Sequence, residues 1–306
     1  MITTLFNPSL DEFFHTTYPF SSVFTEVTPT AIATQYPSNK QNLDLIVGSC
    51  HIIICFDLDR GFTLLWNPSI RKFSELPSSL DEPHRLRAHV TYGFGYDYFS
   101  GAFQVVAFSG YSSGSLDGKV FKVKVKVHTV GTKTWRRIPD FPYGVPVDES
   151  GKFVCGSVNW LTRYGSDYVI VPLDLEKESY RKLLMPYYGE VVVIKSTLEV
   201  LKDCLCTLAF ANTFSDVWLL KEFGNDEFWI KLFRLPSMED PYGFCFYERL
   251  LYVFEDGKVL LQFHSELVVY NPIDGTLKTL QHIYGVSEVY HESVVSPLCF
   301  DMCSGY

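Results

Sequence analysis

The sequence predicts an all-β protein that is β-propeller-like, with six four-stranded blades, five of them clear and one composite. Three observations lead to this prediction. Short apolar segments alternate with turn residues along most of the chain, a recurring unit returns at intervals of 45 to 62 residues, and aromatic residues make up 16% of the 306 residues. Aromatic and β-branched side chains suit a pleated, half-buried surface, so this composition favours strands.

The recurring unit is most explicit at residues 64–77. An apolar run ends at Trp66, Asn67-Pro68-Ser69 turns the chain, and Phe73 precedes a closing Pro77. The asparagine can accept hydrogen bonds from the backbone ahead of it, and the proline fixes φ at about −65°. The unit is therefore predicted to be a β-hairpin with a loop of several residues.

The same frame of apolar strand, turn, aromatic or apolar residue and closing proline recurs along the chain. The equivalent positions are separated by 62, 45, 49 and 48 residues, and they are Phe73, Trp135, Tyr180, Trp229 and Leu277. A repeat of roughly 40 to 50 residues with four short strands is the signature of a propeller blade. The longest gap contains the Gly/Ser-rich segment 109–118, which is expected to be an inserted loop. Residues 281–297 and 1–43 are predicted to build the sixth blade jointly.

This pattern divides the chain into three parts. Residues 1–42 are predicted to be an extended N-terminal segment that packs its aromatic side chains on the propeller, with a short strand at 1–6. Residues 43–297 form the propeller-like domain, and 298–306 form a flexible tail. Helical periodicity is weak, and 198–206 is better explained as a strand that leads into 207–210.

Charge and cysteine usage restrict the class of protein. The net charge of −9 opposes a nucleic-acid partner, which would require a basic face. The basic segment 119–126 alternates Lys with Val or Phe, as a strand with one solvated face does. No secretory signal opens the chain, and no apolar run reaches the roughly 20 residues that span a membrane. We therefore expect a reduced protein of the cytoplasm, the nucleus or both. Five of the eight cysteines lie in apolar runs and are expected in the core: Cys55, Cys155, Cys204, Cys206 and Cys245.

Motifs for catalysis were sought and not found. The chain has no nucleophile elbow, phosphate loop or zinc-protease motif. Gly93-Phe94-Gly95 lacks the third glycine of a dinucleotide fingerprint and is expected to be a strand-end turn. Cys204 and Cys206 share one face of a strand, but no matching ligand pair completes a metal site. His51 and His128 are expected to be packed. We therefore expect no enzyme activity, cofactor or metal, and assign no catalytic, cofactor-binding or metal-binding residue.

Seven segments follow one another in the order seen in a known family. They are 47–51 (VGSCH), 65–72 (LWNPSIRK), 92–97 (YGFGYD), 135–138 (WRRI), 156–161 (GSVNWL), 173–178 (LDLEKE) and 217–224 (VWLLKEFG). Over about residues 43–280 the chain resembles the F-box-associated interaction domain of plant F-box proteins, especially those called F-box/kelch-repeat. The resemblance implies the substrate-recognition module of an SCF-type E3 ubiquitin ligase, which binds a target protein and promotes its ubiquitination.

Two departures from the family pattern matter. An F-box begins with Leu-Pro, an amphipathic helical stretch and a Cys-x-x-x-x-Trp-like element, and residues 1–43 show none of these. The chain is therefore expected to lack its F-box, and a Skp-type adaptor and a cullin are expected partners only of a form that has one. Each kelch repeat also carries a Gly-Gly doublet, which this sequence lacks. The kelch label is thus a loose analogy, whereas the spacing still predicts a propeller.

Binding residues concentrate on loops carried by a rigid scaffold. The candidate contact surfaces are therefore the loops 78–89, 109–118 and 143–150, each of which could equally be a neutral surface insertion. Two alternatives stay open. A decoy without an F-box would bind the target without delivering it. The second alternative is a propeller that acts on glycans, either a hydrolase or a lectin. A hydrolase would bring carboxylates within roughly 5 to 10 Å of each other. Acidic residues do occur at predicted turns, but turns favour Asp and Glu for local hydrogen bonding, so their presence is no evidence of catalysis. These residues are Asp97, Asp117, Asp174, Glu176, Asp216 and Asp274.

Overall fold

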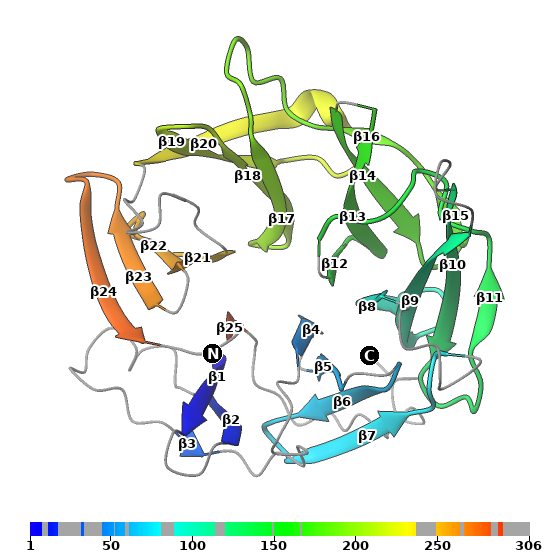
Figure 1. Cartoon of the computed structure of the whole chain (residues 1–306). Coiled ribbons are helices and arrows are strands. Elements are labelled where there is room, and N and C mark those ends of the chain that lie inside the picture. The colour runs from blue at the N-terminus through cyan, green and yellow to red at the C-terminus, as the bar shows by residue number, and fades with distance from the viewer. Residues whose placement is uncertain are drawn as a thin grey trace. The chain divides into compact units, whose positions relative to one another are not determined.

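The structure is a computed structural model, and Figure 1 shows the whole chain. The described residues are 1–7, 12–17, 32–33, 45–51, 53–58, 61–80, 89–113, 120–148, 150–165, 167–236, 249–263, 266–282 and 287–289. The chain divides into two compact units. The middle unit comprises Asp44–Met185 with Tyr290–Tyr306, and the terminal unit combines Met1–Leu43 with Pro186–Val289.

The described part of the middle unit contains three antiparallel sheets (Figure 1). The first consists of β4 (Leu45–Cys50), β5 (Ile53–Asp57), β6 (Thr63–Asn67) and β7 (Lys72–Leu76). The second consists of β8 (His89–Asp97), β9 (Ala102–Ser113), β10 (Val120–Thr129) and β11 (Arg136–Ile138). The third consists of β12 (Ser150–Val154), β13 (Ser157–Tyr164), β14 (Asp167–Asp174) and two short strands on β14, β15 (Ser179–Tyr180) and β16 (Leu183–Leu184). Apart from β15 and β16, which both pair with β14, consecutive strands are neighbours in each sheet, as predicted for blades.

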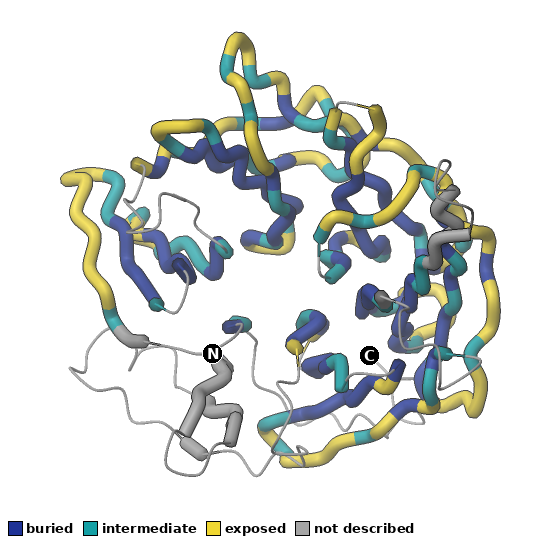
Figure 2. Tube along the Cα trace, in the orientation of Figure 1, coloured by how far each residue is buried: buried dark blue, intermediate teal, exposed yellow. Residues whose placement is uncertain are grey.

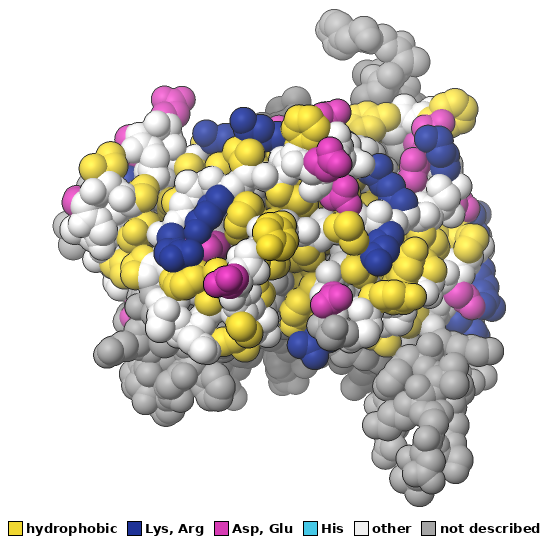
Figure 3. All heavy atoms as spheres, turned by 90° about the horizontal axis from the view of Figure 1, so that it is seen from above, with side chains coloured by type: hydrophobic (Ala, Val, Ile, Leu, Met, Phe, Trp, Pro, Cys, Tyr) yellow, Lys and Arg dark blue, Asp and Glu magenta, His cyan; other side chains and the backbone are white. Residues whose placement is uncertain are grey.

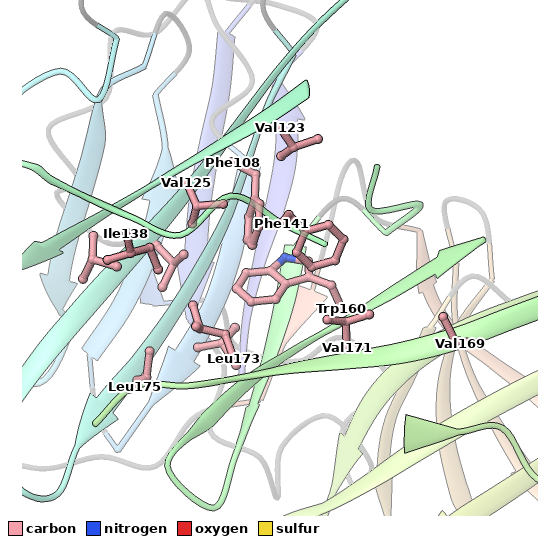
Figure 4. Packing of buried hydrophobic residues seen from close by; sticks show 13 residues of the cluster. Phe108, Val123, Val125, Ile138, Phe141, Trp160, Val169, Val171, Leu173 and Leu175 are labelled. Carbon is pink, nitrogen blue, oxygen red and sulfur yellow. The ribbon is translucent and has the colours of Figure 1, made fainter. Parts of the chain in front are cut away.

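Burial decreases from the second and third strands of a sheet to the fourth (Figure 2). In the first sheet, β6 is buried along its length, whereas β7 is mainly exposed. Strands covered on both faces read as continuous apolar runs, which explains why the sequence marks them so clearly. Between the second and third sheets, the fully buried Trp160 lies edge-on to Phe108, with 4.3 Å between ring centroids (Figure 4).

The second and third sheets are joined through their first strands into one nine-stranded sheet. β8 and β12 run parallel and pair Gly93 with Gly151. A Cβ atom at either glycine would lie 2.5 Å from Val158 Cγ1 and within 2.6 Å of the Trp160 ring. Real Cβ atoms do not approach this closely, so both positions require glycine. The expected strand-end turn at residues 93–95 is therefore wrong, because these residues lie inside β8 and their glycines make room for packing.

The turns before the fourth strands use the predicted side-chain hydrogen bonds. Asn67 Oδ1 accepts the backbone N–H groups of Ser69 at 2.9 Å and Ile70 at 3.4 Å. Asp174 begins the corresponding turn of the third sheet, and Asn271 begins one in the terminal unit. Each accepts the N–H of the residue two positions ahead, at 3.1 Å. The asparagine-based turn predicted from the recurring unit is confirmed.

The recurring aromatic residue and the closing proline form a hydrogen bond between sheets. Trp135, at the start of β11, donates from Nε1 to the carbonyl oxygen of Pro77, which follows β7, at 2.6 Å. Tyr180 of β15 donates from Oη to the carbonyl oxygen of Pro139, which follows β11, at 2.9 Å. In both cases the aromatic residue of one sheet bonds the proline that ends the preceding sheet.

The described part of the terminal unit also contains three four-stranded sheets. The first is β17 (Lys195–Leu201), β18 (Cys204–Phe210), β19 (Phe214–Leu220) and β20 (Trp229–Pro236), with the 3₁₀ helix η1 (Asp226–Phe228) before β20. The second is β21 (Arg249–Val253), β22 (Val259–Phe263), β23 (Glu266–Asn271) and β24 (Thr276–His282). The third is β25 (Ser287–Glu288), β1 (Ile2–Asn7), β2 (Glu12–Thr17) and β3 (Ile32–Ala33). Because β25 pairs with β1, the predicted composite blade is confirmed.

A buried ion-pair network links the first strands of these three sheets. Arg249 on β21 donates to Glu199 on β17 at 3.1 and 3.4 Å, and to the Glu288 carboxylate on β25 at 3.1 Å. It also donates to the carbonyl oxygen of Ser287 at 2.8 Å. Burial opposes its charged form, yet the two carboxylates raise the pKa of Arg249 above its usual value. Loss of either carboxylate would leave buried charge uncompensated, so the network fixes β25 in place.

Two turns were missed by the sequence analysis. The apolar run 153–160 reads in the sequence as one strand, but Cys155-Gly156 turns the chain between β12 and β13. Residues 198–206 were predicted as a strand that continues to 210, but Lys202-Asp203 turns it between β17 and β18. All four turn residues have positive φ, between 48° and 72°. Neither pair is the Asn-Gly or Asp-Gly that signals such a hairpin.

Other local predictions have mixed outcomes. The expected loop 109–118 is partly wrong, because β9 continues to Ser113, and residues 114–118 lie outside the described residues. Cys155 is exposed at its turn rather than in the core, whereas Cys55 and Cys206 are buried as predicted; Cys245 lies outside the described residues. The basic segment is a strand with one buried face, as predicted: the buried side chains are Val123, Val125 and Val127.

The propeller-like fold class is supported by these six groups of strands. The expected short strand at the N-terminus is confirmed as β1. The division at residues 42 and 297 stays a prediction, since 34–44 and 290–306 lie outside the described residues. Among the residues that are described, no helix has the length and apolar character needed to cross a membrane.

Tyr180→Phe tests the hydrogen bond between sheets. The substitution removes the Oη donor to Pro139 and keeps the ring, which lies edge-on to Phe141 with centroids 5.7 Å apart. Since a net hydrogen bond contributes about 0.5–1.5 kcal/mol, we expect the free energy of unfolding in urea to fall by about 1 kcal/mol. Tyr187→Phe, at a side chain 88% exposed, is the control. Equal changes in the two variants would contradict the assignment.

The same variant predicts a pH effect. Burial, with the nearby carboxylates of Asp140 and Glu178, raises the pKa of Tyr180 above its usual value. Above pH of about 10 the unfolded chain therefore loses this proton before the folded chain does, and stability falls as pH rises. The free energy of unfolding in urea should be measured at neutral pH and above pH 10. Its decrease between these two conditions should be smaller for Tyr180→Phe than for the unmodified chain.

Candidate functional site

Three turns of the middle unit lie at one end of its sheets. Each joins a first strand to a second: His51 lies between β4 and β5, 98–101 between β8 and β9, and 155–156 between β12 and β13. Because β8 and β12 run parallel, the turns that follow them lie at the same end. Ring contacts from His51 place the first turn beside the second.

Aromatic rings connect the three turns. The His51 ring lies edge-on to Tyr96 and Tyr98, with centroids 5.2 and 6.5 Å apart. Tyr98 stacks against Phe153 of β12 at 6.4 Å, and Phe103 of β9 lies edge-on to Tyr96 at 5.0 Å. These are the offset and edge-to-face geometries that aromatic pairs prefer. His51, Tyr96, Tyr98, Phe103 and Phe153 are called the aromatic turn cluster below.

The central turn is held by a buried carboxylate. Asp97, 5% exposed, accepts the Phe99 N–H at Oδ1 (3.0 Å) and the Ser100 hydroxyl at Oδ2. The side-chain amide of Gln104 also donates to Oδ2, at 3.3 Å. The turn closes through the Gly101 N–H, which donates to the Asp97 carbonyl oxygen at 2.9 Å. These bonds fix the backbone that presents Tyr98 and Phe99.

One member of the cluster, Tyr98, forms a strongly exposed aromatic pair with its neighbour Phe99. Tyr98 is 63% exposed and Phe99 is 82% exposed, and the side chains of His51 and Cys155 are also exposed. Aromatic residues on rigid backbone are enriched where proteins bind each other. On the face shown in Figure 3, hydrophobic side chains lie interspersed with charged ones. The exposed aromatic side chains on this fixed turn are therefore the candidate contact surface of the middle unit.

Sequence reasoning assigned 97–101 to a turn, which is confirmed, but did not select it as a contact surface. A signal was present, because turns favour small polar residues and this one contains Tyr98-Phe99 between Asp97 and Ser100-Gly101. The proximity of Phe153 to Tyr98 could not be found from the sequence, since it depends on the pairing of β8 with β12. The proximity of His51 to Tyr98 depends on packing between two separate sheets.

The described residues of the three predicted contact loops lie toward the opposite end of the same sheets. Residues 78–80 and 143–148 follow fourth strands, and 109–113 are the end of the second strand of their sheet. The structure describes 78–80, 89, 109–113, 143–148 and 150 of these residues. Ser79 is fixed there, since its hydroxyl bonds the Tyr92 hydroxyl at 2.9 Å and its carbonyl oxygen accepts from Lys126 Nζ at 2.8 Å. A role in binding stays a prediction for all three loops.

The acidic residues at predicted turns mostly make local bonds. Asp97, Asp174 and Asp274 accept backbone N–H groups of their own turns. Asp216 forms ion pairs with Lys231 and Arg234, each at 2.7 Å. Burial alone would raise the pKa of Asp216, but hydrogen bonds and charge from these two cations hold it below its usual value. Glu176 is exposed, and Asp117 lies outside the described residues.

Histidines and cysteines occupy separate environments. His128 is buried, and this burial lowers its pKa; its ring lies 5.2 Å from that of Trp135. Cys206 is buried, and Cys204 is half-buried on the same strand. Within the described residues, no group of three His, Cys, Asp or Glu side chains is arranged to hold a metal ion.

Comparison with known proteins decides the family. Residues 4–243 match the family described as the F-box associated β-propeller domain. The chain belongs to this family. An F-box/kelch-repeat protein of Arabidopsis thaliana is 32% identical over 262 residues, which cover 82% of this chain and 69% of the relative. The F-box protein CPR1 of the same plant is 25% identical over 295 residues, covering 89% of this chain and 71% of that protein.

A further F-box protein of Arabidopsis thaliana is 27% identical over 300 residues, covering 85% of this chain and 70% of the relative. The resemblance drawn from the seven sequence segments is confirmed, and so is the β-propeller fold class. The repeated sheets of this F-box-associated domain are thus its blades.

Asp97→Ala tests the rigidity of the turn that presents the exposed pair. It removes a buried acceptor and leaves its donors without a partner, so we expect the free energy of unfolding to fall by about 1–3 kcal/mol. Amide hydrogen exchange at Phe99 should accelerate as well, since its N–H donates to Asp97.

The control is Asp256→Ala, because Asp256 makes comparable bonds to Lys258 in an exposed turn. Its effect on unfolding should be clearly smaller than that of Asp97→Ala. A loss of stability in the control as large as that in Asp97→Ala would show that the buried carboxylate has no special part in the fold.

Proposed function

We propose that this chain is the substrate-recognition module of an SCF-type E3 ubiquitin-ligase receptor and promotes ubiquitination of the protein that it binds. Membership of the F-box-associated family, with relatives named as F-box proteins, carries this proposal. In this function the propeller domain binds the target and catalyses no reaction itself. A Skp-type adaptor and a cullin join only where an F-box is present, in the cytoplasm, the nucleus or both.

The aromatic turn cluster, together with Phe99 beside it, is the surface that we assign to the target. Phe99 and Tyr98 offer large apolar area on a turn already fixed by Asp97, so little conformational entropy is lost when a partner covers them. Interfaces draw most of their binding energy from a few such residues, Tyr prominent among them. Tyr96 of β8 and Phe153 of β12 contact the Tyr98 ring and support it.

The test compares proteins captured by three forms of the tagged chain expressed in plant cells. They are the unmodified chain, the variant Tyr98→Ser with Phe99→Ser, and a control with Tyr187→Ser and Val192→Ser, whose side chains are 88% and 77% exposed in the terminal unit. We expect at least one protein to be lost about tenfold or more from the cluster variant and kept by the control. Equal capture by all three forms would contradict the assignment.

Delivery to the ligase is tested by fusing the F-box of a relative to the chain. The fusion should recover a Skp-type adaptor together with the captured protein, and the abundance of that protein in the cell should fall. The unfused chain should recover the same protein without the adaptor. If the fusion binds both and the protein's ubiquitination does not rise, the chain is a decoy and the receptor function is wrong.

A further inference from the structure

The composite blade of the terminal unit begins with the very short strand β25 (Figure 1). This strand consists of Ser287–Glu288 and pairs with β1 at Thr3 and Ile2. Two residue pairs supply few backbone hydrogen bonds, and even an isolated pair of strands is only marginally stable in water. Contacts with other sheets are therefore needed to hold β25 and the start of β1 in place.

The backbone of β25 is held by two side chains of the second sheet. Arg249 of β21 donates from Nη1 to the carbonyl oxygen of Ser287 at 2.8 Å. Gln262 of β22 accepts the Ser287 N–H at Oε1, at 2.9 Å. Ser287 is fully buried, and a buried backbone group without a partner costs free energy. These two side chains therefore do for β25 what a neighbouring strand does elsewhere in the sheets.

Arg249 also connects β25 with the first sheet of the terminal unit. It forms ion pairs with Glu199 of β17 and with Glu288 of β25, both at 3.1 Å. The three side chains are 5% to 17% exposed. Hydrogen bonds between ionised groups are about twice as strong as neutral ones, and a guanidinium presents its donors in a fixed plane. Arg249 is therefore the residue through which the three sheets are joined.

The start of the chain lies against the same sheet as this arginine. Met1 is 4% exposed and packs in a hydrophobic cluster with residues of β21, β22 and β23. The buried members of the cluster are Leu251, Leu260, Leu267 and Val269. Ile2, the next residue, pairs with Glu288, which Arg249 binds. The first residues of β1 are thus fixed by apolar packing and, through β25, by the ion-pair network.

This rigidity matters for a segment that precedes Met1. An F-box placed there continues directly into β1, so its orientation depends on how firmly the first residues are held. Transfer of ubiquitin requires that a nucleophilic group of the bound target reach the ligase, and correct positioning of reacting groups is a large part of catalysis. A flexible attachment would instead spread the F-box over many orientations.

We propose that Arg249 is a positioning residue of the receptor. By holding Glu288 and Ser287 it fixes the start of β1, and with it the orientation of an F-box that precedes Met1. This inference rests on the proposed function and goes beyond it, because it separates delivery of the target from its capture. Loss of the contact between Arg249 and β25 therefore leaves both binding steps unchanged and slows the transfer of ubiquitin.

The test uses a variant in which β25 is released and the rest of the network is kept. Glu288→Ala removes one carboxylate and leaves the Arg249–Glu199 pair, whereas loss of Arg249 would leave two carboxylates uncompensated. Glu288→Gln keeps an acceptor for Arg249 and should behave as the unmodified chain. The control is Glu266→Ala, since Glu266 accepts the Thr279 hydroxyl at 3.2 Å within the second sheet.

Amide hydrogen exchange on the chain itself shows whether the network holds β1. Exchange in β1 and β25 should accelerate about tenfold or more in Glu288→Ala, because a hydrogen bond between charged groups is lost. In Glu288→Gln and Glu266→Ala it should change by less than about threefold. Equal exchange in all of these variants would overturn the proposal.

Delivery is measured on fusions that carry the F-box of a relative before Met1. The probe is the protein that the unmodified chain captures and that the variant Tyr98→Ser with Phe99→Ser loses. The Glu288→Ala fusion should recover this protein and the adaptor within about twofold of the unmodified fusion, yet transfer ubiquitin about fivefold or more slowly. The Glu288→Gln and Glu266→Ala fusions should transfer ubiquitin at the unmodified rate.

A flexible linker distinguishes orientation from stability. About ten Gly and Ser residues inserted before Met1 should slow transfer by the unmodified fusion as Glu288→Ala does, and should slow the Glu288→Ala fusion little further. Independent effects, which multiply, would show that Glu288 acts on stability alone and would overturn the proposal. An unmodified rate of transfer in the Glu288→Ala fusion would overturn it as well.

Failure of this inference and failure of the proposed function can be told apart. If the unmodified fusion captures a protein and transfers no ubiquitin to it, the proposed function is wrong, and this inference, which depends on it, is wrong too. If only the effect of Glu288→Ala is missing, the receptor function stands and the positioning role of Arg249 is wrong.

Discussion

The arrangement of the middle unit depends on the contact between Trp160 and two glycines. The indole ring and Val158 lie so close to Gly93 and Gly151 that a Cβ atom at either glycine would meet them at about 2.5 Å. This close approach allows β8 and β12 to pair in parallel and two blades to share one sheet. The pairing sets the Tyr98 turn beside Phe153. The same indole ring lies edge-on to Phe108 of β9 (Figure 4).

The recurring sequence unit connects neighbouring blades through hydrogen bonds. Its turn is stabilised by an asparagine or aspartate, and its aromatic residue bonds the carbonyl oxygen of the previous blade's closing proline at Trp135 and Tyr180. The positions of the recurring unit are thus occupied by residues that stabilise the fold. The first-to-second-strand turns differ instead: Tyr98-Phe99 occupies one, and the charged pair Lys202-Asp203 occupies another. Recognition is assigned to these variable positions.

Much of the fold could be predicted because short stretches of sequence determine the strands and turns. Buried strands read as apolar runs, Asn67 specified its turn, and the repeat spacing gave the blades, including the composite one. The hairpin at Lys202-Asp203 was missed because its left-handed residues are not the usual ones. Gly93 was misassigned because its role depends on Trp160, which is 67 residues away in the sequence. The aromatic turn cluster likewise arises only where separate segments of the chain pack together.

The most direct measurement is the free energy of unfolding of Gly93→Ala and Gly151→Ala, in urea, beside Gly110→Ala. Gly110 lies in β9, where an added Cβ would meet nothing within 4 Å. Overpacking against Val158 and Trp160 should lower the stability of the first two variants by about 1–3 kcal/mol each. Gly110→Ala should stay within about 0.5 kcal/mol of the unmodified chain. If Gly93→Ala and Gly151→Ala were as neutral as Gly110→Ala, Trp160 would not be the contact that joins the two blades.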